Sequence, residues 1–572
     1  MASTSDTVRR RTFLKVIGGA AATATVAGCL GDDDDGEPDD TPTDTPGDDT
    51  PTDTPTDTPD EDDTLFVWAR GSDSSTLDPQ ATTSGEDAKV MQQIYDRVID
   101  FEPGGSSLRE GLAEDFDLSE TTVTLTLRQG VEFHNGDEFT ADDFVATYRR
   151  FVDEDYEAFI GDNQSAYGPY LLGSVDSVSA TGDYEVQLEL ANRYAPMLAN
   201  LAVFALAVMP QGLIEDGHDF AQDPVGTGAF AFDEWDTGDE LIRLEANDDY
   251  WGEGPHVDQL VFEAIEENST RASSLSAGEV HIADGLGTTE IETLENESGV
   301  SVERSEGMLI GYMAFNMATV EEFQDRRVRQ AISHAIDTEA IVENIYRGFA
   351  TRADQPVPPT VMGYNEELDP YPYDTDEAES LLAEAGYEDG FSFELATMSN
   401  PRPYFAQPVQ TAEVVQGNLE DVGIDVSIND FATFDNYLTF TDEGDHDACF
   451  LGWISDNGDP DNFHYALLHP GVSQDDVPDG QDWVSWDTEG FNTSNVAAWA
   501  NTDYMDLIES GQASYDMGER EDLYLQASEI AHEEAPWVYM TYAEEIRGVR
   551  DEVSGYVLEV IGGPFLNLVD LE

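Results

Sequence analysis

From Thr64 onward, short strand-like segments alternate with amphipathic helical segments, and this alternation restricts the fold more than any other feature of the chain. The apolar run 65–69 is typical of a buried strand, and the alternating run 122–128 is typical of a half-buried one. The pattern therefore predicts an α/β fold built on mixed sheets. Because 572 residues are too many for one core, we expect two or three lobes. Helices are expected over residues 141–152, 326–346, 375–385, 410–421 and 520–533.

The charge balance excludes several classes of partner. Asp and Glu number 122 against 24 Lys and Arg, which gives a net charge of −98. Such a surface repels phosphate, so we expect no nucleic-acid binding and no docking driven by anionic lipid headgroups. Lysine occurs only at Lys15 and Lys89, and its scarcity indicates a halophilic protein whose self-repulsion is screened by salt. A merely acidic secreted protein is the alternative.

The amino terminus has the order of an export signal. Arg10 and Arg11 precede the apolar stretch 16–27, which is too short to span a bilayer. The stretch resembles a twin-arginine signal, and residues 26–29 resemble the lipobox of lipoproteins. We therefore expect residues 1–28 to be a twin-arginine lipoprotein signal peptide. Cys29 would then be lipidated and hold the protein on the extracellular face of the cell membrane.

Residues 29–63 differ from the rest of the chain in composition. They are rich in Asp, Thr and Pro, and Thr-Pro-Thr-Asp-Thr-Pro units recur between Thr41 and Pro59. A segment with almost no apolar residues cannot pack, so we expect a disordered acidic tether. The other cysteine, Cys449, lies in the apolar run 448–453. A buried thiol is the preferred interpretation there, ahead of a catalytic nucleophile.

A series of motifs carries a resemblance to a known family. Each is weak alone, and two have local structural meaning: Asn135-Gly136 predicts a hairpin turn, and Thr140 with Asp143 predicts a helix capping box. In order they are 76–79, 131–136, 140–144, 224–228, 247–251, 327–331, 356–359, 384–387 and 452–456. With this order and spacing, the chain from Thr64 resembles the extracytoplasmic solute-binding proteins of the peptide/nickel ABC importer family (family 5). It is most similar to the dipeptide-binding branch and, with its amino terminus, to a lipoprotein of haloarchaeal type.

The resemblance implies a two-lobed, periplasmic-binding-protein-like (Venus flytrap) fold. Lobe I would combine residues 64–313 and 543–572 and contain an inserted subdomain, 96–223. Lobe II would comprise residues 314–542. Two strands that cross between the lobes would form a hinge, and a ligand in the cleft would stabilise the closed form.

The resemblance also implies a ligand site. In the dipeptide-binding branch, the arginine that matches Arg402 receives the peptide carboxylate, and the aspartate that matches Asp456 receives the amino group. A guanidinium fork suits a carboxylate, and an acceptor-only aspartate suits an ammonium. A surface ion pair for Arg402 and a turn cap for Asp456 are the alternatives. Further candidates are the ligand-facing loop of Thr83, Ser84 and Gly85, and the aromatic walls Tyr404, Phe434 and Trp453, for which core packing is the alternative.

The expected function is that of a substrate-binding lipoprotein that captures dipeptides or short oligopeptides and delivers them to an ABC permease and ATPase. We expect a monomer with no cofactor, no metal and no enzymatic activity. Within the same fold, the ligand could instead be an oligosaccharide or a nickel or haem complex. A secreted hydrolase is disfavoured because no Gly-x-Ser-x-Gly or His-Glu-x-x-His motif occurs. A surface adhesin, which would need the tether and no closing cleft, is a further alternative.

Overall fold

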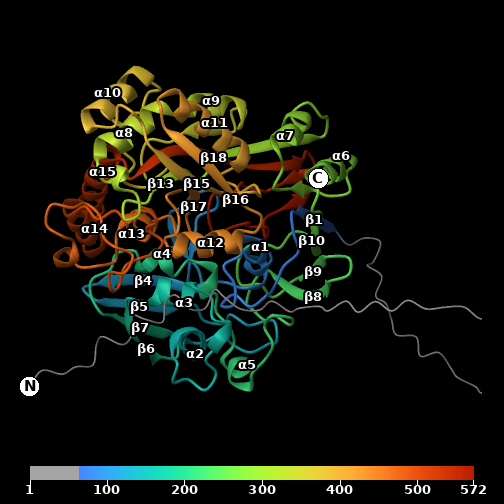
Figure 1. The fold of residues 1–572 in the computed structure, drawn as a ribbon. Coiled ribbons are helices and arrows are strands. Elements are labelled where there is room, and N and C mark those ends of the chain that lie inside the picture. Colours follow the sequence, from blue (N-terminus) through green and yellow to red (C-terminus); the bar gives the residue numbers. More distant parts are fainter. Residues whose placement is uncertain (1–63) are drawn as a thin grey trace, which may run out of the picture. The chain divides into compact units, whose positions relative to one another are not determined.

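A mixed sheet of twelve strands runs through the part of the chain that the computed structural model describes, residues 64–572 (Figure 1). The predicted signal peptide, the tether and Cys29 lie outside the described residues. Mixed parallel and antiparallel pairing together with many helices confirms the predicted α/β class.

One long strand, β18 (Trp537–Arg550), joins the two halves of this sheet. Its first half pairs with β13 (Leu309–Phe315) and β14 (Ala350–Arg352). Its second half pairs with β12 (Val300–Glu306) and β11 (Ile282–Ala283). Two chain segments therefore cross between the halves. One is β18 itself, and the other is the connection from β12 to the next strand, β13. The lobe limits expected at 313/314 and 542/543 fall inside β13 and β18, close to this change of partners.

The half of the sheet that contains β11 and β12 comes first in chain order. It includes the amino-terminal strand β1 (Leu65–Arg70), which is parallel to β10 (Gln259–Ala264) and β11. Antiparallel strands β9 (Leu241–Ala246) and β8 (Phe230–Asp236) extend it. Short pairs form from β2 (Ile99–Phe101) with β3 (Leu108–Glu110), and from β19 (Val553–Ser554) with β20 (Asp570–Leu571). The helices of this half are α1 (Gly85–Ile94), α6 (Asn268–Ala277) and α7 (Thr288–Leu294).

The second half of the sheet is built from β13, β17 (Ala448–Ile454), β15 (Ser392–Met398) and β16 (Asp425–Phe431). β17 is antiparallel to β13 and parallel to β15. In Figure 1, helices α9 (Thr338–Asn344) and α11 (Pro408–Asp421) lie beside this half, above β15 and β18. The helices of the region are α8 (Arg326–Ala335), α9 (Thr338–Asn344), α10 (Thr375–Ala385), α11 (Pro408–Asp421), α12 (Phe434–Asp442), α13 (Asp461–Leu468), α14 (Thr502–Ala513) and α15 (Met517–Glu534).

A separate four-stranded antiparallel sheet lies within the expected subdomain 96–223, below the larger sheet in Figure 1. Its order is β4 (Ala113–Ser119), β5 (Thr122–Leu127), β7 (Glu185–Leu190) and β6 (Val175–Gly182). The predicted turn is present, with Gly136 at a positive φ of 84°. The predicted capping box is present too, since Asp143 accepts a 2.8 Å hydrogen bond from the Thr140 backbone N–H. Helices α2 (Ala141–Val152), α3 (Tyr167–Leu172), α4 (Met197–Asn200) and α5 (Gln211–Asp216) belong to this region.

The single helix predicted over 326–346 is wrong. The chain forms α8 and α9 instead, with a break at Ile336 and Asp337. Asp337 ends the helical path because its carboxylate accepts a 2.9 Å hydrogen bond from the Ala340 backbone N–H and so caps a new helix. The amphipathic period continues across the break, which is why the pattern alone indicated one helix.

Candidate functional site

Arg402 lies in a tight turn and faces an aromatic ring. The backbone N–H groups of Arg402 and Phe405 each donate to the other residue's carbonyl at 2.9 Å. The guanidinium carbon of Arg402 is 3.5 Å from the ring centroid of Phe434, the first residue of α12. Arg402 forms no ion pair with any residue whose side chain the structure describes. An aromatic face attracts a cation but leaves its N–H donors free, so this arginine can still bind an anion.

A pair of glycines leaves room for this turn to pack closely against the sheet. Gly311 of β13 and Gly452 of β17 lie opposite each other in the strand ladder. A Cβ on Gly452 would be 2.3 Å from Cδ2 of Tyr404, and one on Gly311 would be 2.5 Å from its carbonyl oxygen. The Tyr346 hydroxyl donates to the same carbonyl at 2.9 Å. The two glycines therefore let Tyr404 lie directly on the sheet, where burial raises its pKa to about 12.

The substitution Gly452→Ala tests this packing. We expect it to lower the free energy of unfolding by about 1–3 kcal/mol, because the new methyl group overlaps the Tyr404 ring. Denaturant unfolding at constant high salt measures the change. Gly417→Ala, inside α11, is the control: a Cβ there meets nothing within 4 Å, and we expect a gain of about 0.5–1 kcal/mol. Equal effects of the two variants would contradict the proposed contact.

Asp456, just beyond the end of β17, presents a carboxylate with no cationic partner. It accepts hydrogen bonds from the Tyr167 hydroxyl at 2.5 Å and from Nδ2 of Asn462 at 3.2 Å. It forms no ion pair within residues 64–572. Burial raises its pKa, and the two hydrogen bonds oppose that rise. Asp456 is thus a half-buried carboxylate with no cation beside it among the described residues.

Asn462 connects Asp456 to Trp453. Its Oδ1 accepts from the Trp453 indole N–H and from the backbone N–H of Asp456, both at 2.9 Å. Its Nδ2 also donates to the Tyr170 hydroxyl. The Trp453 ring is therefore fixed by its polar edge, while the end of β17 is held in one conformation.

The next two aspartates have structural partners, unlike Asp456. Asp459 makes a bidentate ion pair with Arg520, with N···O distances of 2.9 and 2.8 Å. Asp461 accepts from Gln512 at 2.9 Å, from Tyr194 at 3.2 Å and from Tyr524 at 3.3 Å. Burial, followed by the nearby charge of Asp459, raises the pKa of Asp461 to about 7. Of these three acids, Asp456 is the one best placed to accept an external cation.

Residues from the region of the four-stranded sheet also contact the segment 456–462. Besides the contacts of Tyr167, Tyr170 and Tyr194, Asn457 donates from Nδ2 to Oδ1 of Asn200 at 2.7 Å. Sequence reasoning did not identify these tyrosines. They lie more than 260 residues from their partners along the chain, and no local pattern marks them.

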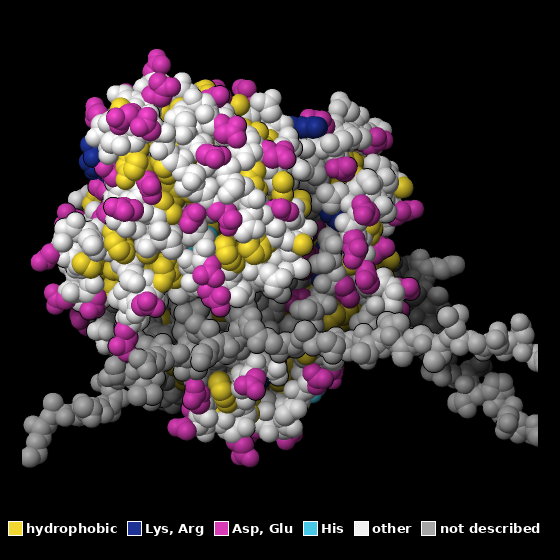
Figure 2. Space-filling model, viewed as in Figure 1, with side chains coloured by type: hydrophobic (Ala, Val, Ile, Leu, Met, Phe, Trp, Pro, Cys, Tyr) yellow, Lys and Arg dark blue, Asp and Glu magenta, His cyan; other side chains and the backbone are white. Residues whose placement is uncertain are grey.

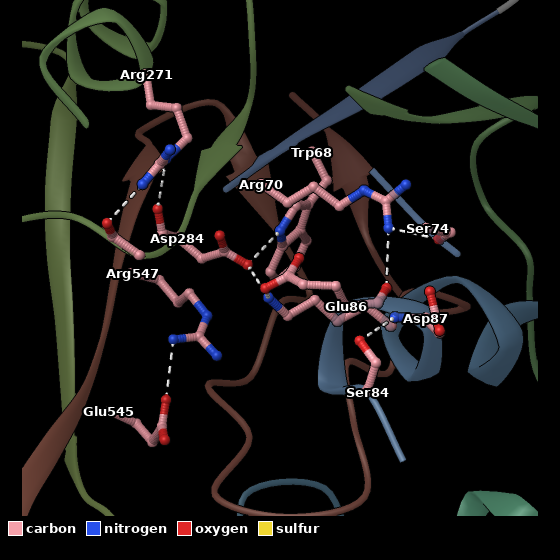
Figure 3. Close-up of polar contacts among 12 residues, drawn as sticks. Trp68, Arg70, Ser74, Ser84, Glu86, Asp87, Arg271, Asp284, Glu545 and Arg547 are labelled. Atoms are coloured by element: carbon pink, nitrogen blue, oxygen red, sulfur yellow. Dashed lines mark hydrogen bonds and ion pairs between the residues drawn. The ribbon is translucent and has the colours of Figure 1, made fainter. Parts of the chain in front are cut away.

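Thr83, Ser84 and Gly85 lie at the start of α1, next to the buried polar cluster shown in Figure 3. Ser84 is the N-cap and accepts from the Asp87 backbone N–H at 3.5 Å, while Thr83 and Gly85 are exposed. In the cluster, Asp284 accepts from Lys89 at 2.5 Å and from the Trp68 indole at 3.0 Å. Five of the other candidate residues lie on or near β17. Trp453 belongs to the strand and Asp456 follows it, while Tyr404 packs on its Gly452 and lies in the same turn as Arg402, which faces Phe434. The hydrogen bonds of Ser84 join it to Thr82, Asp87 and Ala88, and none links the loop 83–85 to these five residues within the described chain.

The other candidate chemistries receive less support. Cys449 is fully buried and unpaired, as predicted, and burial raises the pKa of its thiol. His464 is also fully buried, and Nδ1 of its ring is 2.9 Å from the Tyr504 hydroxyl. Across residues 64–572, no group of three or more His, Cys, Asp or Glu side chains could hold a metal ion. None of the helices in this range is both long and apolar enough to cross a bilayer.

Comparison with known proteins identifies the family. Residues 107–475 match the model of "Bacterial extracellular solute-binding proteins, family 5 Middle". The dipeptide-binding protein of Escherichia coli (strain K12) is 31% identical over 531 residues, which cover 89% of this chain and 95% of that protein.

Two solved structures share the fold. The ABC transporter-associated periplasmic binding protein of Helicobacter pylori, in complex with the peptide STSA, matches with a TM-score of 0.75 at 32% identity, over 89% of this chain and 98% of that one. The dipeptide binding protein of Pseudoalteromonas sp. SM9913, in complex with Met-Leu, matches with a TM-score of 0.73 at 28% identity, over 89% and 100%. The expected two-lobed fold is thereby confirmed. With its sequence match and its fold in agreement, the chain belongs to the bacterial extracellular solute-binding proteins of family 5.

Proposed function

We propose that this protein captures dipeptides or short oligopeptides outside the cell and delivers them to the permease and ATPase of an ABC importer. The observation that carries the proposal is a pair of opposite charges, Arg402 and Asp456, which adjoin the same strand and have no ionic partner among the described side chains. The peptide-binding relatives and the two peptide complexes support the same ligand class.

The chemistry of a free peptide matches this pair. A peptide carries an ammonium and a carboxylate, and both must lose water on entering a cleft. In our proposal, Asp456 binds the ammonium and Arg402 binds the carboxylate. Tyr404, Phe434 and Trp453 form apolar walls, and the loop 83–85 faces the ligand from lobe I. Affinity then comes mainly from the termini, and no catalysis is required.

The edge of β17 offers further binding groups. Beside β15, β17 is paired only at Ala448 and Cys449, so residues 451–454 have no ladder partner on that edge among the described strands. An extended peptide can donate to and accept from such an edge in the manner of an added strand. This supports a peptide over a ligand without a repeating backbone.

We propose that residues 64–313 and 543–572, with the insert 96–223, form lobe I and that residues 314–542 form lobe II. The crossings β12–β13 and β18 would act as the hinge, and a ligand that contacts both sides would favour closure. Outside the lobes, we propose twin-arginine export, lipidation at Cys29, an acidic tether and a monomeric, salt-dependent fold.

Blocked dipeptides test this function directly. In calorimetric titration at about 2 M NaCl, where the Debye length is below about 3 Å, we expect a free dipeptide to bind saturably. N-acetylation or C-amidation of the same dipeptide should each weaken binding at least about tenfold, because each leaves one buried charge unpaired. Equal binding of free and blocked forms would contradict recognition of the termini. No binding to the folded protein would point to a longer peptide, a sugar or a metal complex.

A further inference from the structure

Ile454, at the end of β17, is an apolar side chain left open beside the proposed ligand site. Its exposed fraction is 40%, one of five exposed large hydrophobic side chains among residues 64–572. The preceding residues 448–451 of the same strand are buried. The strand thus emerges from the core at Ile454, two residues before Asp456.

The pleat of β17 determines which face Ile454 occupies. Side chains two residues apart share a face, so Phe450, Gly452 and Ile454 point the same way. On that face, the Phe405 ring stacks on Phe450 with centroids 4.7 Å apart, and Tyr404 covers Gly452. The Arg402–Phe405 turn therefore covers the first two positions and leaves the third uncovered. Ile454 continues the floor on which the turn packs.

The position of Ile454 relative to Asp456 indicates which part of a peptide would meet it. Two residues span at most about 7 Å of chain. A peptide ammonium held by Asp456 is attached to the Cα that carries the first side chain. That side chain consequently lies within reach of Ile454, while the backbone at Asp456 is fixed by its hydrogen bond to Asn462.

We propose that Ile454 is a specificity-determining residue that makes the site prefer peptides with an apolar first side chain. The inference rests on the proposed function and adds a ligand preference to it. Contact between an aliphatic side chain and Ile454 removes apolar surface of both from water, whereas a serine side chain buries little and brings a hydroxyl that needs a partner. The expected preference is about tenfold for leucine over serine at the first position.

Calorimetric titration of the wild-type protein and two variants with Leu-Gly, Ser-Gly and Gly-Leu tests the proposal. Ile454→Thr keeps the β-branched shape but replaces the ethyl group by a hydroxyl, and so removes most of the apolar contact. We expect it to lower the Leu-Gly over Ser-Gly ratio from about tenfold to about twofold, and to change Ser-Gly binding little. Leu65→Thr is the matched control, because Leu65 is also a strand residue with a 40% exposed fraction, and its ratio should stay as in the wild type.

The outcomes separate the two proposals. Equal binding of Leu-Gly and Ser-Gly to the wild type, or an unchanged ratio in Ile454→Thr, would overturn the role of Ile454 and leave the proposed function intact. A fall in affinity for all three dipeptides alike would indicate a structural effect and would also overturn it. Failure of all three to bind the folded wild type would overturn the proposed function and, with it, this inference.

Discussion

Asp456→Asn and Arg402→Gln are each expected to weaken dipeptide binding by about 30-fold to more than 1,000-fold. Both side chains are half-buried in the free protein, and a bound peptide would cover them. Removal of one partner from a charge pair that is buried in the complex costs about 2–5 kcal/mol, because the remaining charge is then desolvated without compensation. Asparagine keeps the size of Asp456 and can still accept from the Tyr167 hydroxyl. The loss would therefore reflect charge and not shape. Calorimetric titration with a free dipeptide measures it.

Blocked ligands assign each charge to one peptide terminus. If Asp456 binds the ammonium, Asp456→Asn should no longer distinguish a free dipeptide from its N-acetyl form, yet should still reject the C-amide. Arg402→Gln should show the reverse. Since burial raises the pKa of Asp456 in the unliganded protein, affinity should fall on acidification at a higher pH than for an ordinary aspartate, and this pH dependence should vanish in Asp456→Asn.

Surface charges of the same type provide the controls. Arg347 makes a 3.0 Å ion pair with Glu292 and is 44% exposed, and Asp376 is an exposed residue of α10. Arg347→Gln and Asp376→Asn should leave dipeptide affinity within about twofold, because exposed charges contribute little in screened solution. If these variants weaken binding as much as the site variants do, a general charge effect is at work and the two anchors are wrong.

Local signals predicted the elements more reliably than their limits. The expected helices 141–152 and 375–385 match α2 and α10 because a cap marks the start of each, at Thr140 and Asp374. Asp337 is the same kind of cap, yet the amphipathic period continues across it, and the helix predicted over 326–346 follows the period instead of the cap. The crossing of β18 between the halves of the sheet depends on partners that are distant in the chain: in one half Val549 pairs with Ile282 across 267 residues, and in the other Thr541 pairs with Arg352 across 189.

The candidate site shows the same division. Family motifs identified Arg402 and Asp456, and the structure adds that neither has an ionic partner among the described side chains. Gly311 and Gly452 could not be recognised from sequence, because their shared role exists only once β13 and β17 pair and Tyr404 lies across them. Tyr167 is similar: its hydroxyl meets Asp456 across 289 residues. Such residues are defined by tertiary contact, which no periodicity encodes.

The acidic surface should make the fold depend on salt, because the chain has few basic side chains to offset its carboxylates. Several of the basic side chains form ion pairs inside the fold and so do not offset the surface charge. Arg520 pairs with Asp459, and Arg329, which has no exposed side-chain surface, pairs with Asp482 at 3.1 Å. Figure 2 shows acidic side chains scattered over the visible face and very few basic ones. With a net charge of −98, the surface carboxylates repel one another unless the solvent screens them.

We therefore expect the protein to lose its fold when NaCl is lowered from about 2 M to about 0.05 M, since the Debye length grows from below 3 Å to above 10 Å and carboxylates several ångströms apart begin to repel. Far-UV circular dichroism should lose its α/β signal cooperatively, and restored salt should recover it. Concentrated sucrose is the control, because it favours burial of apolar surface without screening charge. Rescue by sucrose as complete as by NaCl would assign the effect to hydration, and an unchanged spectrum at low salt would contradict salt dependence altogether. Rescue by NaCl alone would mean that the surface carboxylates, and not a weak core, set the stability of this fold.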